Sequence, residues 1–154
     1  MRFLCDEMLA RLARLLRAAG YDTYLAENGE ADRPMLQRAR DEARVVLTRD
    51  RRLAAKAAPG AVLITADQAL DQARALTVVL PIDWNLAPFT RCVMDNAELR
   101  AATPAEVARM PPESRAGPGP FSACPACGRL YWPGSHVKRL SARLHDLAQI
   151  VRQA

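Results

Sequence analysis

Short apolar runs alternate with helical patterns through the first half of the chain. The runs predict strands over Arg2–Cys5, Tyr21–Leu25, Val45–Thr48 and Ala61–Thr65, with a fifth short strand over Thr77–Leu80. Between them, apolar residues recur every three or four positions, which is typical of amphipathic helices. Strands that alternate with helices favour a parallel sheet with right-handed crossovers, so we expect an α/β fold.

An aspartate lies at each of the four junctions between a predicted strand and the next helix. Asp6, Asp50 and Asp67 follow strands, and Asp32 begins the helix after the second strand. The carboxyl ends of parallel strands lie along one edge of a sheet, so we expect these side chains to face the same edge. Carboxylates converge stably only when they are protonated or when a cation lies between them. Mg²⁺ or Mn²⁺ would meet this need and would support phosphodiester hydrolysis.

Each of these aspartates also has a purely structural interpretation. Aspartate is a favoured N-cap residue and occurs at helix starts without any chemistry. Serine, threonine and asparagine could cap equally well, so the choice of aspartate at all four junctions favours a metal site. We predict that Asp6, Asp50 and Asp67 hold the metal, and that Asp32 completes the site or positions a water molecule.

The basic residues indicate a polyanionic partner. The net charge is +5, and 20 of the 22 basic residues are arginines, whose planar guanidinium suits bidentate phosphate contacts. Arg14 and Arg17 on the first predicted helix and Arg49 beside Asp50 are predicted to contact RNA phosphates. The alternatives are a solvated helix face with ordinary ion pairs, and a general bias of the chain toward alanine and arginine.

Several motifs together resemble a known family. They are Phe3–Leu9, Leu12–Arg17, Gly20–Thr23, Leu47–Asp50, Pro88–Cys92 and Cys124–His136. In combination they are similar to the PIN-like ribonuclease domain of the Mut-seven C-terminal type, in which a zinc ribbon follows the PIN-like fold. The resemblance implies a PIN-like nuclease domain over residues 1–87 and a zinc-ribbon-like module with a C-terminal helix over residues 88–154. It also implies a metal-dependent ribonuclease site at the four aspartates.

The cysteines of the second half predict a zinc site. Cys124 and Cys127 form a Cys-x-x-Cys-Gly knuckle, and structural zinc takes four tetrahedral ligands. The family pattern implies a second Cys-x-x-Cys, but here Cys92 is followed three residues later by Asp95. Asp95 keeps the ribbon spacing as an oxygen ligand, His136 is the alternative fourth ligand, and loss of zinc is the third possibility.

Aromatic and basic residues are interleaved after the knuckle. Tyr131, Trp132, Lys138 and Arg139 could bind single-stranded RNA by stacking and by phosphate contacts, or the two rings could pack the ribbon against the α/β domain. A last helix is predicted from Ser135, and its apolar stripe needs a partner, either the ribbon or a second copy of the chain.

The sequence also bears on where the protein is located. No run of about 18 uncharged apolar residues exists, so we expect no membrane span. Asp6 and Glu7 follow the first apolar run directly, which is unlike a signal peptide, so we expect a cytoplasmic protein. The prediction is a Mg²⁺- or Mn²⁺-dependent ribonuclease with a structural zinc and RNA as its partner. The alternatives are a non-catalytic RNA-binding adaptor and a phosphatase or nucleotide hydrolase that uses the same carboxylates.

Overall fold

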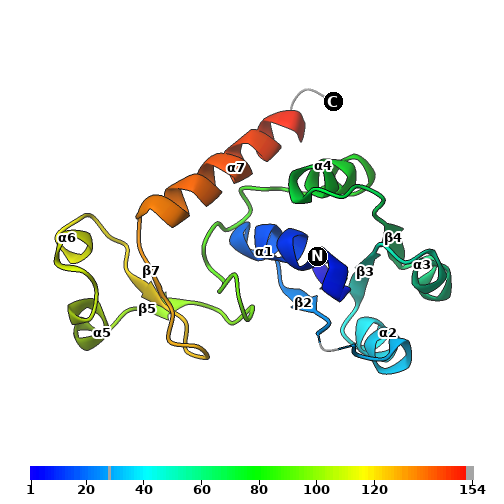
Figure 1. Ribbon diagram of the computed structural model, residues 1–154, viewed down its shortest axis with the longest axis horizontal. Helices are drawn as coiled ribbons and strands as arrows, with labels where there is room; N and C mark the ends of the chain where they lie inside the picture. The colour runs from blue at the N-terminus through cyan, green and yellow to red at the C-terminus, as the bar shows by residue number, and fades with distance from the viewer. Residues whose placement is uncertain (28, 152–154) are drawn as a thin grey trace.

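A four-stranded parallel sheet forms the centre of the first half of the protein. The computed structural model describes residues 1–27 and 29–151. The strands are β1 (Arg2–Cys5), β2 (Thr23–Leu25), β3 (Arg44–Thr48) and β4 (Ala61–Leu63), in the order β2-β1-β3-β4 (Figure 1). The predicted α/β fold is confirmed, although β2 and β4 are each two residues shorter than expected.

Helices cover both faces of this sheet. They are the short 3₁₀ helix η1 (Glu7–Leu9), α1 (Ala10–Ala18), α2 (Asp32–Asp41), α3 (Arg51–Ala57) and α4 (Ala69–Val79). Successive side chains of a strand point to opposite faces of the sheet. Phe3 and Cys5 therefore pack in the hydrophobic core between the sheet and helices α1 and α4, and Leu4 packs in the core between the sheet and helices α2 and α3. Local periodicity therefore dictates a three-layer arrangement.

The predicted strand at Thr77–Leu80 is wrong. These residues form the last turn of α4 and the residue after it, because Ala73 and Leu76 continue the buried helical stripe into the core. The Thr77 hydroxyl donates to the Ala73 carbonyl and accepts from Trp84 Nε1. Val78 is 83% exposed and Val79 is 57% exposed, so the two valines that suggested a strand face solvent.

The second half of the chain forms a small antiparallel sheet and a long helix. Strands β5 (Arg100–Ala101), β6 (Ser122–Ala123) and β7 (Leu130–Tyr131) pair in the order β5-β6-β7. Two short helices, α5 (Pro104–Ala108) and α6 (Pro112–Arg115), lie between β5 and β6, and α7 (Ser135–Val151) follows β7. None of the helices in the described part of the chain is long and apolar enough to cross a membrane.

Helix α7 runs back from the small sheet over the first half of the protein (Figure 1). Leu144 and Leu147 are buried in the same core as α1 and α4, whereas Val137 in the first turn packs beside the cysteines. The apolar stripe of α7 therefore has a partner that the sequence did not suggest. Leu144 and Leu147 pack on α1 and α4 of the same chain, and Val137 packs beside the small sheet.

A buried arginine joins the two halves of the chain. Arg17 on α1 is 4% exposed, and its Nε donates to the Thr23 carbonyl of β2 at 2.9 Å. Its Nη1 donates to the carbonyls of Met94, at 2.6 Å, and Val93, at 3.3 Å. Burial lowers the pKa of Arg17. The expectation that Arg17 contacts RNA is not supported, because its guanidinium is enclosed and bonded to backbone carbonyls.

A second set of hydrogen bonds strengthens this junction. The Asn96 side chain accepts from the Thr23 backbone N–H at 2.9 Å and donates to Asp22 Oδ1 at 2.7 Å. Arg44 also donates to Asp22, at 2.8 Å. Burial opposes ionisation of this carboxyl, but the hydrogen bonds from Arg44 and Asn96 lower the pKa of Asp22 overall. The turn that carries Cys92 and Asp95 is thus fastened to the edge strand of the sheet.

We expect Arg17→Met to lower the free energy of unfolding by about 2–4 kcal/mol, because it removes a buried hydrogen bond to the Thr23 carbonyl and two partly buried ones to the Val93 and Met94 carbonyls. Urea denaturation followed by circular dichroism measures this change. Arg14→Met, on the exposed face of the same helix, is the matched control and should stay within about 0.5 kcal/mol of the wild type. Equal losses in the two variants would contradict the proposed role of Arg17.

Candidate active site and metal centre

Asp6 and Asp50 lie at neighbouring strand ends and share the side chain of Thr48. Asp6 follows β1 and Asp50 follows β3. The buried Thr48 hydroxyl donates to Asp6 Oδ2 and accepts from the Asp50 backbone N–H at 2.9 Å. The Arg49 backbone N–H also donates to Asp6 Oδ2, at 3.0 Å. The Asp6 carboxylate is therefore held in one orientation by the end of β3.

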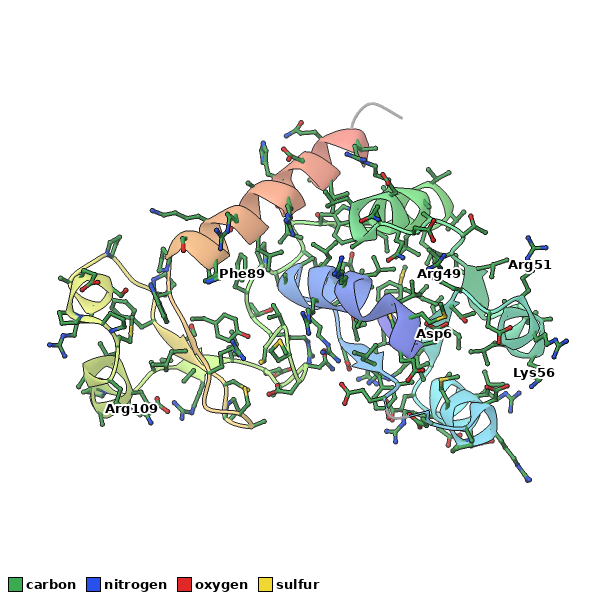
Figure 2. The ribbon with its side chains drawn as sticks, in the orientation of Figure 1. Asp6, Arg49, Arg51, Lys56, Phe89 and Arg109 are labelled. Carbon is green, nitrogen blue, oxygen red and sulfur yellow. The ribbon has the colours of Figure 1, made fainter. Side chains whose placement is uncertain are left out.

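Asp67 is linked to the same group of residues through Arg49. The Arg49 guanidinium forms an ion pair with Asp67 Oδ1, while the Asp67 side chain remains 77% exposed. Figure 2 shows Asp6 and Arg49 together at this end of the sheet. Asp6, Asp50 and Asp67 are thus connected to one another through Thr48 and Arg49.

Asp32 lies apart from these three residues. It is the first residue of α2, and its carboxylate pairs with Lys56 Nζ of α3 at 2.7 Å. In the part of the chain that the structure describes, no three of the four aspartates bring their oxygen atoms within 4.8 Å of one another. Among the described residues, the four carboxylates therefore do not form a closed cluster.

The structure separates the capping aspartates from the others. Asp6 caps η1 by accepting from the Met8 N–H at 3.0 Å, and Asp50 caps α3 by accepting from the Arg52 N–H at 2.7 Å. The N-cap interpretation does not hold for Asp32 and Asp67, because Ala31 and Gln68 occupy those positions in α2 and α4. Helix capping therefore accounts for only two of the four aspartates.

Three cysteines and one aspartate form a compact cluster in the second half of the chain. Ligand atoms of Cys92, Asp95, Cys124 and Cys127 all lie within 4.8 Å of one another. Cys92 and Asp95 belong to a turn closed by the Asn96 N–H to Cys92 carbonyl bond. A second turn holds Cys124 and Cys127 and is closed by the Gly128 N–H to Cys124 carbonyl bond. Three sulfurs and one carboxylate could hold a metal ion, in keeping with zinc.

The groups of this cluster are hydrogen-bonded in a way that depends on protonated thiols. The Cys124 thiol donates to Asp95 at 3.3 Å, and the Ala97 N–H donates to Asp95 Oδ1 at 3.0 Å. Burial opposes ionisation of Asp95, but these bonds and those from the other thiols hold its pKa at about 2. The hydrogen bond with Asp95 conversely raises the pKa of Cys127 to about 12.

His136, the alternative fourth ligand, lies outside the cluster. Its side chain is exposed, and its Nδ1 lies 3.1 Å from Arg139 Nη2. The Tyr131 hydroxyl does reach the cluster, since it donates to Cys92 Sγ at 3.2 Å and accepts from the Val93 N–H at 3.0 Å. Tyr131 is therefore a packing residue, and its hydroxyl orients the Cys92 sulfur.

The remaining predicted RNA-contacting residues are accessible. Arg14, Lys138 and Arg139 are exposed, and Arg49 is 27% exposed. Sequence reasoning did not identify Thr48, although a threonine at the end of a buried strand, two residues before an aspartate, was a usable signal. Its hydroxyl cannot remain buried without hydrogen-bond partners, and the strand end offers Asp6 and Asp50.

Comparisons with known proteins identify the family of this chain. A family model described as the Mut7-C RNAse domain matches residues 1–144. A 47-residue segment, 30% of this chain, is 47% identical to the human exonuclease mut-7 homolog, of which it covers 5%. The chain thus matches only a small part of that relative's length. No solved structure matches the chain significantly. Because the family model spans nearly the whole chain, the protein belongs to the Mut7-C RNAse domain family.

Proposed function

We propose that the protein is a metal-dependent ribonuclease that hydrolyses RNA phosphodiester bonds. Asp6, Asp50 and Asp67 would hold Mg²⁺ or Mn²⁺, whose hard character suits carboxylate oxygens. Membership of an RNAse domain family supports the reaction class. The observation that carries the assignment is that Thr48 and Arg49 connect the three aspartates: Asp6 and Asp67 through their carboxylates, and Asp50 through its backbone N–H.

The residues of this edge have distinct proposed roles. A bound divalent ion would neutralise phosphate charge and lower the pKa of a water molecule. Thr48 keeps Asp6 oriented, so that its carboxylate need not reorganise when the ion binds. Arg49 pairs with Asp67 in the free protein and would contact a phosphate when the carboxylate turns to the ion. Asp32, paired with Lys56, would complete the site or position a water molecule.

A non-catalytic RNA-binding adaptor is the second candidate. The capping bonds of Asp6 and Asp50 favour it, because these bonds give both residues a structural role without any metal. Such a protein would bind RNA without cleaving it, and its RNA affinity would not depend on Mg²⁺ or Mn²⁺.

We expect Asp50→Asn to lower the rate of RNA cleavage by about 100-fold or more, because it removes a charged metal ligand. Asparagine caps helices as well as aspartate does, so the melting temperature should remain close to that of the wild type. Cleavage of a fluorescent RNA in Mn²⁺ buffer measures the effect. The control is Asp41→Asn, an exposed position at the end of α2, which should leave the rate unchanged.

Wild-type rates in Asp50→Asn would contradict the metal assignment. A wild-type protein that binds RNA but cleaves none with Mg²⁺ or Mn²⁺ would favour the adaptor.

We also propose that Cys92, Cys124, Cys127 and Asp95 bind a structural zinc ion.

We expect about one zinc per chain by elemental analysis, and loss of zinc in Cys124→Ser with a lower melting temperature. Asp95→Cys should bind zinc more tightly, because thiolate is a softer and stronger ligand. His136→Ala is the control and should keep its zinc, since His136 lies outside the cluster. Loss of zinc in His136→Ala with retention in Asp95→Ala would contradict the proposed ligand set.

Zinc affinity should rise with pH. The pKa of Cys127 is raised to about 12, so its thiol is protonated near neutral pH in the metal-free protein. Zinc binds the thiolate and must displace this proton, so acid competes with zinc. Competition with a chromophoric chelator at pH 6 and pH 8 should show tighter binding at the higher pH, with proton release detected by calorimetry in two buffers. A pH-independent affinity would show that the thiol is not a ligand.

A further inference from the structure

A large groove lies between the two halves of the chain. Its walls come from α1, the start of α4, the segment around β7 and the first half of α7, and its volume is about 1230 Å³. This exceeds the roughly 300–1,000 Å³ of pockets for single small molecules. Phe89 lies between α1 and α7 at this groove, as Figure 2 shows.

The groove is strongly basic. It is lined by six arginines from three helices and the loop before β7, namely Arg11, Arg14, Arg74, Arg129, Arg139 and Arg143. The acid among the lining residues is Asp71, which pairs with Arg74 at 2.8 Å. Within the described part of the chain, the other five arginines make no ion pair. A concave surface with unneutralised cations attracts a polyanion.

Trp132 supplies an aromatic face in the same wall. A Cβ atom at Gly134 would lie 2.6 Å from Trp132 Nε1, so the indole packs directly on the glycine backbone. This contact restrains the ring, which is only partly buried. Tyr131 is not available in the same way, because it is buried and bonded to Cys92. A restrained ring among arginines suits stacking of an unpaired base.

Part of the groove lining comes from residues that directly follow the proposed catalytic edge in the chain. Gln68 and Ala69 line it, and they follow Asp67 directly in the chain. Arg11 and Arg14 line it from α1, the helix that follows Asp6 and η1. A strand lying along the groove from Trp132 toward Gln68 would therefore approach the carboxylates.

We propose that this groove binds a single-stranded segment of RNA, with a base stacked on Trp132 and phosphates on Arg14, Arg129 and Arg143. The inference rests on the proposed ribonuclease function and adds the substrate class and its path. A duplex is disfavoured, because its bases are already stacked and paired and offer no free face to the indole.

Fluorescence anisotropy with a labelled single-stranded RNA tests the proposal. The zinc-loaded Asp50→Asn protein is used without Mg²⁺ or Mn²⁺, so that binding is separated from cleavage. Adding Arg129→Glu and Arg143→Glu should raise Kd at least about tenfold and reduce the slope of log Kd against log salt by about 1.4, for two lost phosphate contacts. The control pair, Arg40→Glu and Arg109→Glu, makes the same charge change outside the groove and should alter Kd by less than about threefold.

A spectroscopic readout tests the stacking. Of the two tryptophans, Trp84 is fully buried, so quenching of tryptophan fluorescence by RNA reports on Trp132. Quenching is expected with single-stranded RNA and is expected to be lost in Trp132→Leu.

Two results would overturn the groove assignment. One is an equal loss of RNA affinity in the groove variant (Arg129→Glu with Arg143→Glu) and in the control variant (Arg40→Glu with Arg109→Glu). The other is equal affinity for duplex RNA with the same dependence on the groove arginines. The nuclease proposal can fail on its own. If the wild-type protein binds RNA in the groove but does not cleave it, the nuclease proposal is wrong and the groove assignment is kept. If the wild-type protein cleaves RNA but the variant with Arg129→Glu and Arg143→Glu binds RNA with normal affinity, the groove assignment is rejected and the nuclease proposal stands.

Discussion

The buried guanidinium of Arg17 is the interaction on which the arrangement of the protein most depends. It joins the Thr23 carbonyl at the sheet edge to the Val93 and Met94 carbonyls, which lie in the turn between Cys92 and Asp95. A buried carbonyl that loses its donor costs about 1–3 kcal/mol, so the junction depends on a side chain long enough to reach all three carbonyls. Cys92 and Asp95, two of the four residues that could hold a metal ion, are thereby attached to the α/β fold.

This attachment also creates the concave surface between the two halves. Arg17 fixes the cysteine turn on one side, and Leu144 and Leu147 fix α7 on α1 and α4 on the other. The groove between them takes its walls from both parts of the chain. A rearrangement of Cys92 and its neighbouring cysteines would therefore change the groove wall, because the Tyr131 hydroxyl donates to Cys92 Sγ and the next residue, Trp132, lines the groove.

At the carboxylate edge, neighbouring side chains give similar residues different environments. Asp6 and Asp50 each bind a helix N-terminus and share Thr48, whereas Asp67 is mostly exposed and pairs with Arg49. Asp32 is paired with Lys56 on another helix. This edge of the sheet thus combines two hydrogen-bonded carboxylates, those of Asp6 and Asp50, with the exposed carboxylate of Asp67, which pairs with the Arg49 guanidinium. This is the arrangement from which we infer the hydrolytic site.

Local pattern in the sequence was sufficient for the parallel sheet, for the positions of Asp6 and Asp50 just after β1 and β3, and for the turn that holds Cys124 and Cys127. These features depend on neighbours within a few residues, where periodicity and turn chemistry act. Only the tertiary structure decided that Arg17 is buried, that α7 packs on α1 and α4, and that Asp95 rather than His136 joins the sulfurs. Arg17 meets partners 76 and 77 residues away, and no local pattern encodes a contact at that separation.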